Sequence, residues 1–121
     1  MDLSEKQTRE KIIDKELYDS GWKEEYIKRE VNSVKSDFKV RKYEFYTPEH
    51  NGRFIDYVLL NTDKSVLAII EAKRFSLDAE KGSIQADTYQ KDIEAQTGEA
   101  VPIFLTNGGD WQKRRNYWQE R

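Results

Sequence analysis

The sequence contains no cysteine and a single histidine, and these two shortages exclude whole classes of site. Without cysteine there is no disulfide framework and no thiolate metal site, and His50 alone cannot build a multi-histidine metal cluster. No apolar run approaches the length of a membrane-spanning helix, and the first 20 residues are charged throughout, unlike a signal peptide. We therefore expect a soluble protein of the cytoplasm with no membrane partner.

An excess of positive charge is also lacking. Lysine and arginine number 21 against 23 aspartate and glutamate residues, so the formal net charge is −2. Charge alone does not indicate DNA binding, and an enzyme of this composition that acts on DNA needs local basic patches or partner domains that grip it. The length of 121 residues fits one domain, and most aliphatic residues gather in segments 54–60, 66–70 and 101–105.

Helix signals occur twice along the chain, which has no internal repeat and no low-complexity linker. Residues 4–18 are predicted to form a helix that Ser4 caps and Gly21 ends. Its apolar stripe is formed by Ile12, Ile13, Leu17 and Tyr18. A second helix is predicted over residues 78–97, where Gly98 stops it.

Strand signals are clearest over residues 53–60 and 66–75, which are apolar on two faces, as expected for central strands covered on both sides. The weaker or shorter candidates are residues 26–31, 38–46 and 103–106. Residues 107–109 predict a turn. Residues 111–118 fit either an edge strand or a short helix.

This order of elements predicts a fold of the α/β class, with an α+β mixed sheet. Segment 66–106 is a strand–helix–strand unit, so its two strands should run parallel with a right-handed crossover. The earlier strands should form an antiparallel hairpin. We therefore expect one domain over residues 1–121, with a central mixed sheet flanked by helices in the order α-β-β-β-α-β.

Two carboxylates, Asp56 and Glu71, lie in strands that otherwise read as buried, where a carboxylate needs a partner. If Asn61 faces Val66 across a loop of residues 62–65, the same register makes Asp56 face Glu71. Directly opposed residues share a face of the sheet, with Cβ atoms about 4.5–5.5 Å apart. Two carboxylates that close repel unless one is protonated or a cation lies between them, and an all-oxygen pocket suits Mg²⁺ or Mn²⁺.

Lys73 follows Glu71 by two residues and should leave the same face of the strand. A metal ion beside an ammonium suits a scissile phosphate, because the metal activates a bound water and Lys73 can orient that water or stabilise developing charge. The backbone carbonyl of Ala72 can complete the metal shell. The same residues also fit a simpler interpretation, in which Glu71 and Lys73 form an ordinary ion pair beside Asp56.

The order and spacing of several segments resemble the PD-(D/E)XK nuclease superfamily and, more narrowly, the N-terminal nuclease domain of the restriction (motor) subunit of type I restriction enzymes. The match runs from about Ser4 to Gly109. The segments that carry it are Thr8-Arg9, Ile12-Ile13-Asp14 with Leu17, Gly21-Trp22, Arg53-Phe54-Ile55-Asp56-Tyr57-Val58-Leu59, Ile70-Glu71-Ala72-Lys73-Arg74, Gln85 with Tyr89, and Thr106-Asn107-Gly108.

The resemblance implies a restriction-endonuclease-like core and magnesium-dependent hydrolysis of DNA phosphodiester bonds. Asp56 and Glu71 match the metal-binding acids, and Lys73 matches the catalytic lysine. Gln85 and Tyr89 match a Gln-x-x-x-Tyr motif, whose spacing puts both side chains on one helix face, and are expected to line the cleft and touch DNA or position Lys73.

Some members of the superfamily also use a glutamate on the first helix. Glu5 matches it by its place before Thr8-Arg9, and Glu10 competes with it; either can equally be a solvated charge. One departure is Ile55, which stands where the superfamily pattern has proline. A second is that the sequence has no Gly-x-x-x-x-Gly-Lys-Ser/Thr phosphate loop, so the ATP-driven motor of the family is absent from these residues.

The resemblance also implies partners: double-stranded DNA, methylation and specificity subunits, and a helicase or translocase motor region. The chain is then expected to be a fragment of a longer restriction subunit. The alternative function is a non-catalytic DNA-binding or docking module of the same fold. The aromatic and basic segment 111–118 could bind DNA or anchor a partner, or bury its aromatics in an edge strand.

Overall fold

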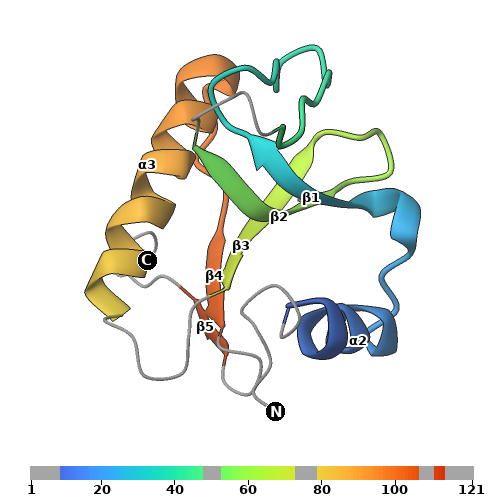
Figure 1. Ribbon diagram of the computed structural model, residues 1–121. Helices are drawn as coiled ribbons and strands as arrows, with labels where there is room; N and C mark the ends of the chain where they lie inside the picture. The colour runs from blue at the N-terminus through green and yellow to red at the C-terminus, as the bar shows by residue number, and fades with distance from the viewer. Residues whose placement is uncertain (1–8, 48–52, 73–78, 107–110, 114–121) are drawn as a thin grey trace.

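The computed structural model describes residues 9–47, 53–72, 79–106 and 111–113 (Figure 1). The helical elements are the π-helical turn η1 (Arg9–Ile13), α2 (Asp14–Asp19), the 3-10 turn η2 (Glu24–Tyr26) and α3 (Ala79–Thr97). The strands are β1 (Ile27–Asn32), β2 (Phe54–Leu60), β3 (Val66–Ala72), β4 (Ile103–Thr106) and β5 (Trp111–Lys113).

The five strands form one sheet in the order β1-β2-β3-β4-β5. Strand β1 pairs antiparallel with β2, and β2 pairs antiparallel with β3. Strand β4 is parallel to β3, with α3 as the connection between them, and β5 is antiparallel to β4. The prediction of a mixed sheet flanked by helices, with a parallel strand–helix–strand unit, is therefore confirmed.

Each face of the sheet has its own core. On the α3 face, Tyr89 and Ile93 of the helix pack against strand residues that include Val58, Ile69 and Leu105. On the opposite face, Ile13 and Leu17 pack against Ile27, Tyr57, Leu59 and Ile70. Because apolar side chains leave β2 and β3 on both sides, these central strands are covered on both faces, as the sequence predicts.

The first helix is shorter and less regular than expected. Residues 4–8, including Ser4, lie outside the described ranges, and η1 precedes α2 as a wider π-helical turn. A π turn holds more residues than an α turn and so changes which side chains face the core. Ile13 and Leu17 are buried, whereas Ile12 and Tyr18 are exposed, so half of the predicted stripe is wrong. Gly21 does follow the helix end, at φ 97°.

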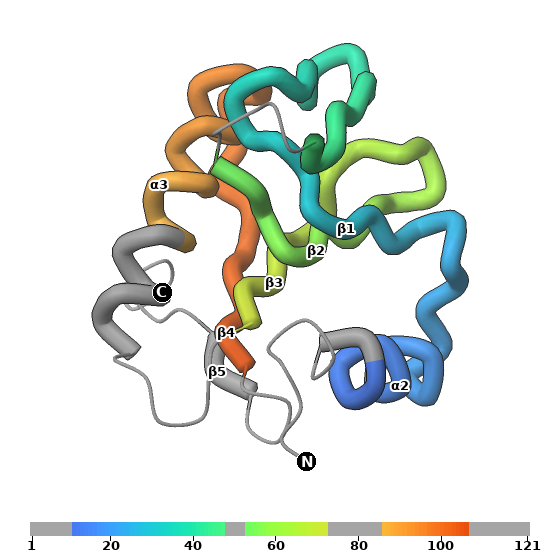
Figure 2. Tube along the Cα trace, viewed as in Figure 1, coloured from blue at the N-terminus to red at the C-terminus, as the bar shows by residue number. Residues whose placement is uncertain are grey.

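The prediction of a strand over residues 38–46 is wrong. Only isolated bridges, Asp37 with Lys42 and Val31 with Phe45, form in this part of the described chain. Asp37 Oδ1 accepts hydrogen bonds from the backbone N–H groups of Lys39 and Val40, which makes a turn there. The segment lies beside the C-terminal half of α3 (Figure 2), where Phe38 N–H donates to Gln96 Oε1 at 2.7 Å.

The β2–β3 hairpin has the predicted register at its centre but a different turn. Tyr57 faces Ile70, the register in which Asp56 faces Glu71. At the turn Leu60, not Asn61, is the last residue to pair with Val66, so the expected four-residue loop is wrong. Leu67 is the additional residue of a bulge, and Lys64 at φ 73° helps to close the longer loop.

The second half of the chain follows the prediction closely. Helix α3 ends at Thr97, and Gly98 at φ 79° donates its N–H to the Glu94 carbonyl at 2.8 Å. Of the two alternatives for residues 111–118, an edge strand or a short helix, residues 111–113 form the edge strand. Positions 107–110 and 114–121 lie outside the described ranges. Within the described ranges no helix is long and apolar enough to cross a membrane.

Candidate active site

Asp56 and Glu71 meet where strands β2 and β3 stop pairing through their backbones. The Asp56 N–H donates to Glu71 Oε1 at 3.1 Å, and the Ala72 N–H donates to Asp56 Oδ2 at 2.8 Å. Each carboxylate thus reaches the backbone of the opposite strand. The structure therefore brings the two predicted acids together in one place.

The two carboxylates differ in their exposure. The Glu71 residue is 4% exposed, whereas Asp56 is half-buried. Glu71 is flanked in the sheet by Leu105 of β4, and Ala72 by the fully buried Thr106. A buried anion needs compensation from hydrogen-bond donors or a cation. The backbone N–H of Asp56 supplies one such donor to Glu71.

A second polar cluster joins α2 to the strand that carries Asp56. The hydroxyl of Tyr57 donates to Asp14 Oδ1 at 2.6 Å, and the Arg29 guanidinium contacts the same carboxylate at 3.4 Å. Arg29 also donates to Glu24 Oε2 at 2.6 Å and lies over the Tyr57 ring, 5.7 Å from its centroid. The cluster fixes the position of Tyr57, the neighbour of Asp56, relative to α2.

Hydrogen bonds and neighbouring charges shift the pKa values of two members of this cluster, Arg29 and Glu24. Burial alone would lower the pKa of Arg29, but its hydrogen bond to Glu24 and the charge of Asp14 outweigh burial and raise the pKa overall. The hydrogen bond from Arg29, followed by that from Tyr18, lowers the pKa of Glu24. Asp14 belongs to a segment that carries the family resemblance, but no role is predicted for it from the sequence; its spacing of three residues from Leu17, which places both on one helix face, is the signal that could have found it.

The remaining predicted site residues are placed less completely. Lys73 and Glu5 lie outside the described residues. Gln85 is in α3 and Glu10 in η1, in parts of these elements whose side chains are not described. Tyr89 is 1% exposed and packs in the core on the α3 face. An open contact of Tyr89 with DNA therefore does not fit this burial, and a positioning role for it stays a prediction.

The described residues contain a pair of acids rather than a larger ligand cluster. No three carboxylate, histidine or cysteine side chains among them gather in a way that could hold a metal ion. Mg²⁺ commonly binds through one or two carboxylates and keeps several waters. A pair such as Asp56 and Glu71, with a nearby backbone carbonyl, therefore has the right donor chemistry for this ion.

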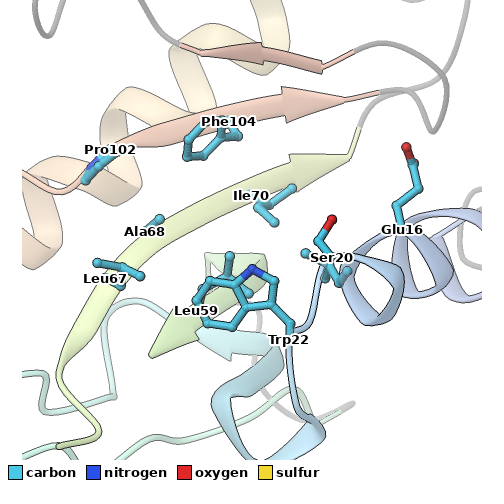
Figure 3. Close-up of a pocket in the computed structure, with 10 residues that line it drawn as sticks. Glu16, Ser20, Trp22, Leu59, Leu67, Ala68, Ile70, Pro102 and Phe104 are labelled. Atoms are coloured by element: carbon cyan, nitrogen blue, oxygen red, sulfur yellow. The ribbon is translucent and has the colours of Figure 1, made fainter. Parts of the chain in front are cut away.

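A cavity of about 630 Å³ lies on the face of the sheet opposite α3, away from the carboxylate pair. Figure 3 shows Trp22 and Leu59 on one side and Phe104 on the other, with Glu16 and Ser20 at one end. The lining is mainly apolar, and neither Asp56 nor Glu71, the two predicted catalytic residues within the described ranges, contributes to it. This apolar cavity therefore does not include the carboxylate pair of the candidate active site.

No protein-family model and no curated protein matches this sequence. Among solved structures, the chain is similar to the fragment structure of a "putative HsdR subunit of a type I restriction enzyme from Vibrio vulnificus YJ016", with a TM-score of 0.61 and 23% sequence identity. The similarity covers 94% of this chain and 23% of that one. At this identity the likeness shows the fold alone, which is a restriction-endonuclease-like mixed sheet flanked by helices.

Proposed function

We propose that the chain is a metal-dependent nuclease domain of the PD-(D/E)XK superfamily that hydrolyses DNA phosphodiester bonds. The observation that carries this proposal is the convergence of Asp56 and Glu71 at the point where β2 and β3 stop pairing. The fold likeness to a restriction-subunit fragment and the order of sequence motifs support the same reading.

The residues divide the chemistry among them. Asp56, Glu71 and the Ala72 carbonyl would hold Mg²⁺, with Mn²⁺ as a possible substitute, and Glu5 is a further candidate ligand. The bound ion would supply Lewis-acid activation of the phosphate and of a water. Lys73 would orient the attacking water and stabilise charge on the phosphate. Gln85 would position the lysine or the substrate, and the buried Tyr89 would help to position the lysine.

The burial of Glu71 gives this assignment a physical basis. A carboxylate that is 4% exposed is poorly hydrated, so it gains more from a cation than an exposed acid does. Asp56 is half-buried and so remains open to a ligand that brings its own water molecules. Glu71 is thus a buried ligand held by a hydrogen bond, and Asp56 is a more accessible one, which suits an ion that keeps part of its water shell.

The cellular setting follows from the same resemblance. We propose that the domain works in the cytoplasm on double-stranded DNA, as part of a longer restriction subunit. Methylation and specificity subunits and a helicase or translocase motor region would be its partners. The chain spans 23% of the HsdR fragment that it matches, which is consistent with further domains in such a protein. With a net charge of −2, the domain would depend on these partners to hold DNA.

Calorimetric titration with MgCl₂ and MnCl₂ tests the proposal directly. The wild-type chain should bind one of these ions, whereas Asp56→Asn and Glu71→Gln should each weaken binding by about tenfold or more. Asp63→Asn is the matched control, because Asp63 is an exposed acid in the loop of the same hairpin. Absence of metal binding by the wild type, or equal binding by all three variants, would overturn the proposal.

A non-catalytic module of the same fold is the alternative. It would bind DNA with a strong salt dependence and no metal requirement. Cleavage of plasmid DNA by the assembled restriction complex separates the two functions, since only the nuclease loses cutting in Asp56→Asn while DNA binding remains. Normal cutting by that variant would favour the alternative.

A further inference from the structure

Strand β1 contains a residue in a backbone conformation that is unusual within a sheet. Glu30 has φ 52°, in the left-handed region that costs a residue with a side chain about 1–2 kcal/mol. Such a conformation persists where the surrounding structure requires it, and it often marks a functional position. In the register of β1 and β2, Arg29 faces Tyr57 and Val31 faces Ile55, so the rung between them is Glu30 with Asp56.

At this pair of residues, the side chains of β1 and β2 change the face of the sheet on which they pack. Residues two apart in a strand normally share a face, yet Tyr57 packs on the α2 side and Ile55 on the α3 side. The same switch occurs in β1, between Ile27 on the α2 side and Val31 on the α3 side. The left-handed residue Glu30 therefore rotates the β1–β2 ribbon next to Asp56.

In a regular strand, where backbone N–H groups point alternately to the two neighbouring strands, the Asp56 N–H would point to β1 and not to β3. The Ile69 N–H points away from β2, because it donates to the Pro102 carbonyl. Backbone groups alternate in direction along a strand, so those of Ile70 point to β2, where Ile70 pairs with Tyr57. The next residue in β2, Asp56, would then direct its N–H toward β1 and the Glu30 carbonyl. Instead the Glu30 carbonyl accepts the N–H of Tyr46 at 3.0 Å, outside the sheet.

The rotation supplies the hydrogen bond that holds one of the acids. With the Glu30 carbonyl turned outward, the Asp56 N–H points to β3 and donates to Glu71 Oε1 at 3.1 Å. We propose that Glu30 is a positioning residue, whose left-handed backbone frees the Asp56 N–H to fix the Glu71 carboxylate. The inference rests on the proposed function for its catalytic meaning, but the backbone device can be tested separately.

Substitutions at position 30 separate backbone from side chain. Glycine adopts positive φ without cost, so Glu30→Gly should keep the geometry although it removes the carboxylate. Valine is β-branched and strongly disfavours positive φ, so Glu30→Val should restore a regular rung. Lys28→Val places the same side chain two residues earlier in β1, where Lys28 pairs regularly with Val58, and is the control for valine itself. Glu30→Ala is a milder variant should Glu30→Val not fold.

Two measurements on these variants give the test. Metal affinity of Glu30→Gly should stay within about threefold of wild type, whereas Glu30→Val should bind about 10–100-fold more weakly, as for other supports of metal ligands. Amide hydrogen exchange should show the Tyr46 N–H losing protection in Glu30→Val and keeping it in Glu30→Gly and Lys28→Val.

The outcomes distinguish the two proposals. Equal loss of metal affinity in Glu30→Gly and Glu30→Val would overturn the inference, because it would implicate the side chain. Unchanged Tyr46 protection and unchanged metal affinity in both Glu30→Val and Glu30→Ala would also overturn it. If the wild type binds no metal while Tyr46 protection still falls in Glu30→Val, the proposed function fails, but the role of the Glu30 backbone in the local structure is supported.

Discussion

Asp56 and Glu71 are joined by a hydrogen bond from the backbone of one acid to the side chain of the other. The Asp56 N–H donates to Glu71 Oε1 at 3.1 Å, while the Asp56 carboxylate accepts from the next residue, Ala72. The carboxylates therefore take part in the connection between β2 and β3. Removal of either acid should change the stability of the fold as well as any metal affinity.

For Asp56, the expected effect on stability depends on whether an acceptor oxygen remains. Asp56→Ala leaves the part-buried Ala72 N–H without its acceptor and should lower the free energy of unfolding by about 1–3 kcal/mol. Asp56→Asn keeps a side-chain oxygen and should cost clearly less. Urea denaturation without metal measures both, and Asp19→Ala, at an exposed ion pair, should change stability by about 0.5 kcal/mol or less. Equal losses in the alanine and asparagine variants at position 56 would contradict this account.

The Tyr57 hydroxyl should contribute measurably to stability through its bond to the mostly buried Asp14 carboxylate. Tyr57→Phe removes this 2.6 Å hydrogen bond and should cost about 1.5–3 kcal/mol, the range for bonds to charged groups. Tyr18→Phe is the matched control, because Tyr18 bonds to Glu24 from an exposed position. Thermal unfolding measures the stability lost in each variant. A larger loss of stability in Tyr18→Phe would show that burial does not determine the strength of these hydrogen bonds.

Stability should fall at alkaline pH through Tyr43. Burial raises the pKa of Tyr43 to about 12 from its usual value of 10.0, and its hydroxyl donates to the Lys64 carbonyl at 2.6 Å. Since the folded pKa exceeds the unfolded one, the contribution is complete below pH 10 and is lost as the pH rises toward 12. Tyr43→Phe should be less stable near pH 8 but show a weaker loss between pH 10 and 12.

Chemical denaturation across this pH range checks the Tyr43 prediction. Tyr46→Phe, at a residue that is 51% exposed, is the control and should retain the alkaline loss of the wild type. A wild-type and a Tyr43→Phe chain that lose stability in parallel above pH 10 would assign the effect to other groups.

Two aliphatic residues of β3 should respond very differently to truncation. Ile69→Ala removes a fully buried side chain from the α3-facing core and should cost about 2–5 kcal/mol. Leu67 is the bulged residue and is 41% exposed, so Leu67→Ala should cost about 1 kcal/mol or less. Equilibrium unfolding of the two variants measures the contrast, and similar losses of stability would contradict the exposed position of the Leu67 side chain.

The sequence by itself was enough to predict the mixed sheet, the parallel unit from β3 to β4 and the facing of Tyr57 and Ile70. These features follow from local signals, because continuous apolar segments mark buried strands and Gly98 marks a helix end. The encounter of Asp56 with Glu71 follows from the same register, because facing residues in a hairpin lie on adjoining strands.

Only the tertiary structure decided the rest. Glu30 carries no sequence mark of a left-handed residue, since glycine and asparagine are the residues that normally signal it. Its carbonyl accepts a hydrogen bond from Tyr46, and its neighbours Arg29 and Val31 pair with Tyr57 and Ile55 of β2, so its surroundings come from segments that are distant in the sequence. The burial of Tyr89 and the bond from Tyr57 to Asp14 likewise depend on how α3 and α2 pack on the sheet. Local propensity carries no information about such packing, because these contacts form only when the whole sheet has assembled.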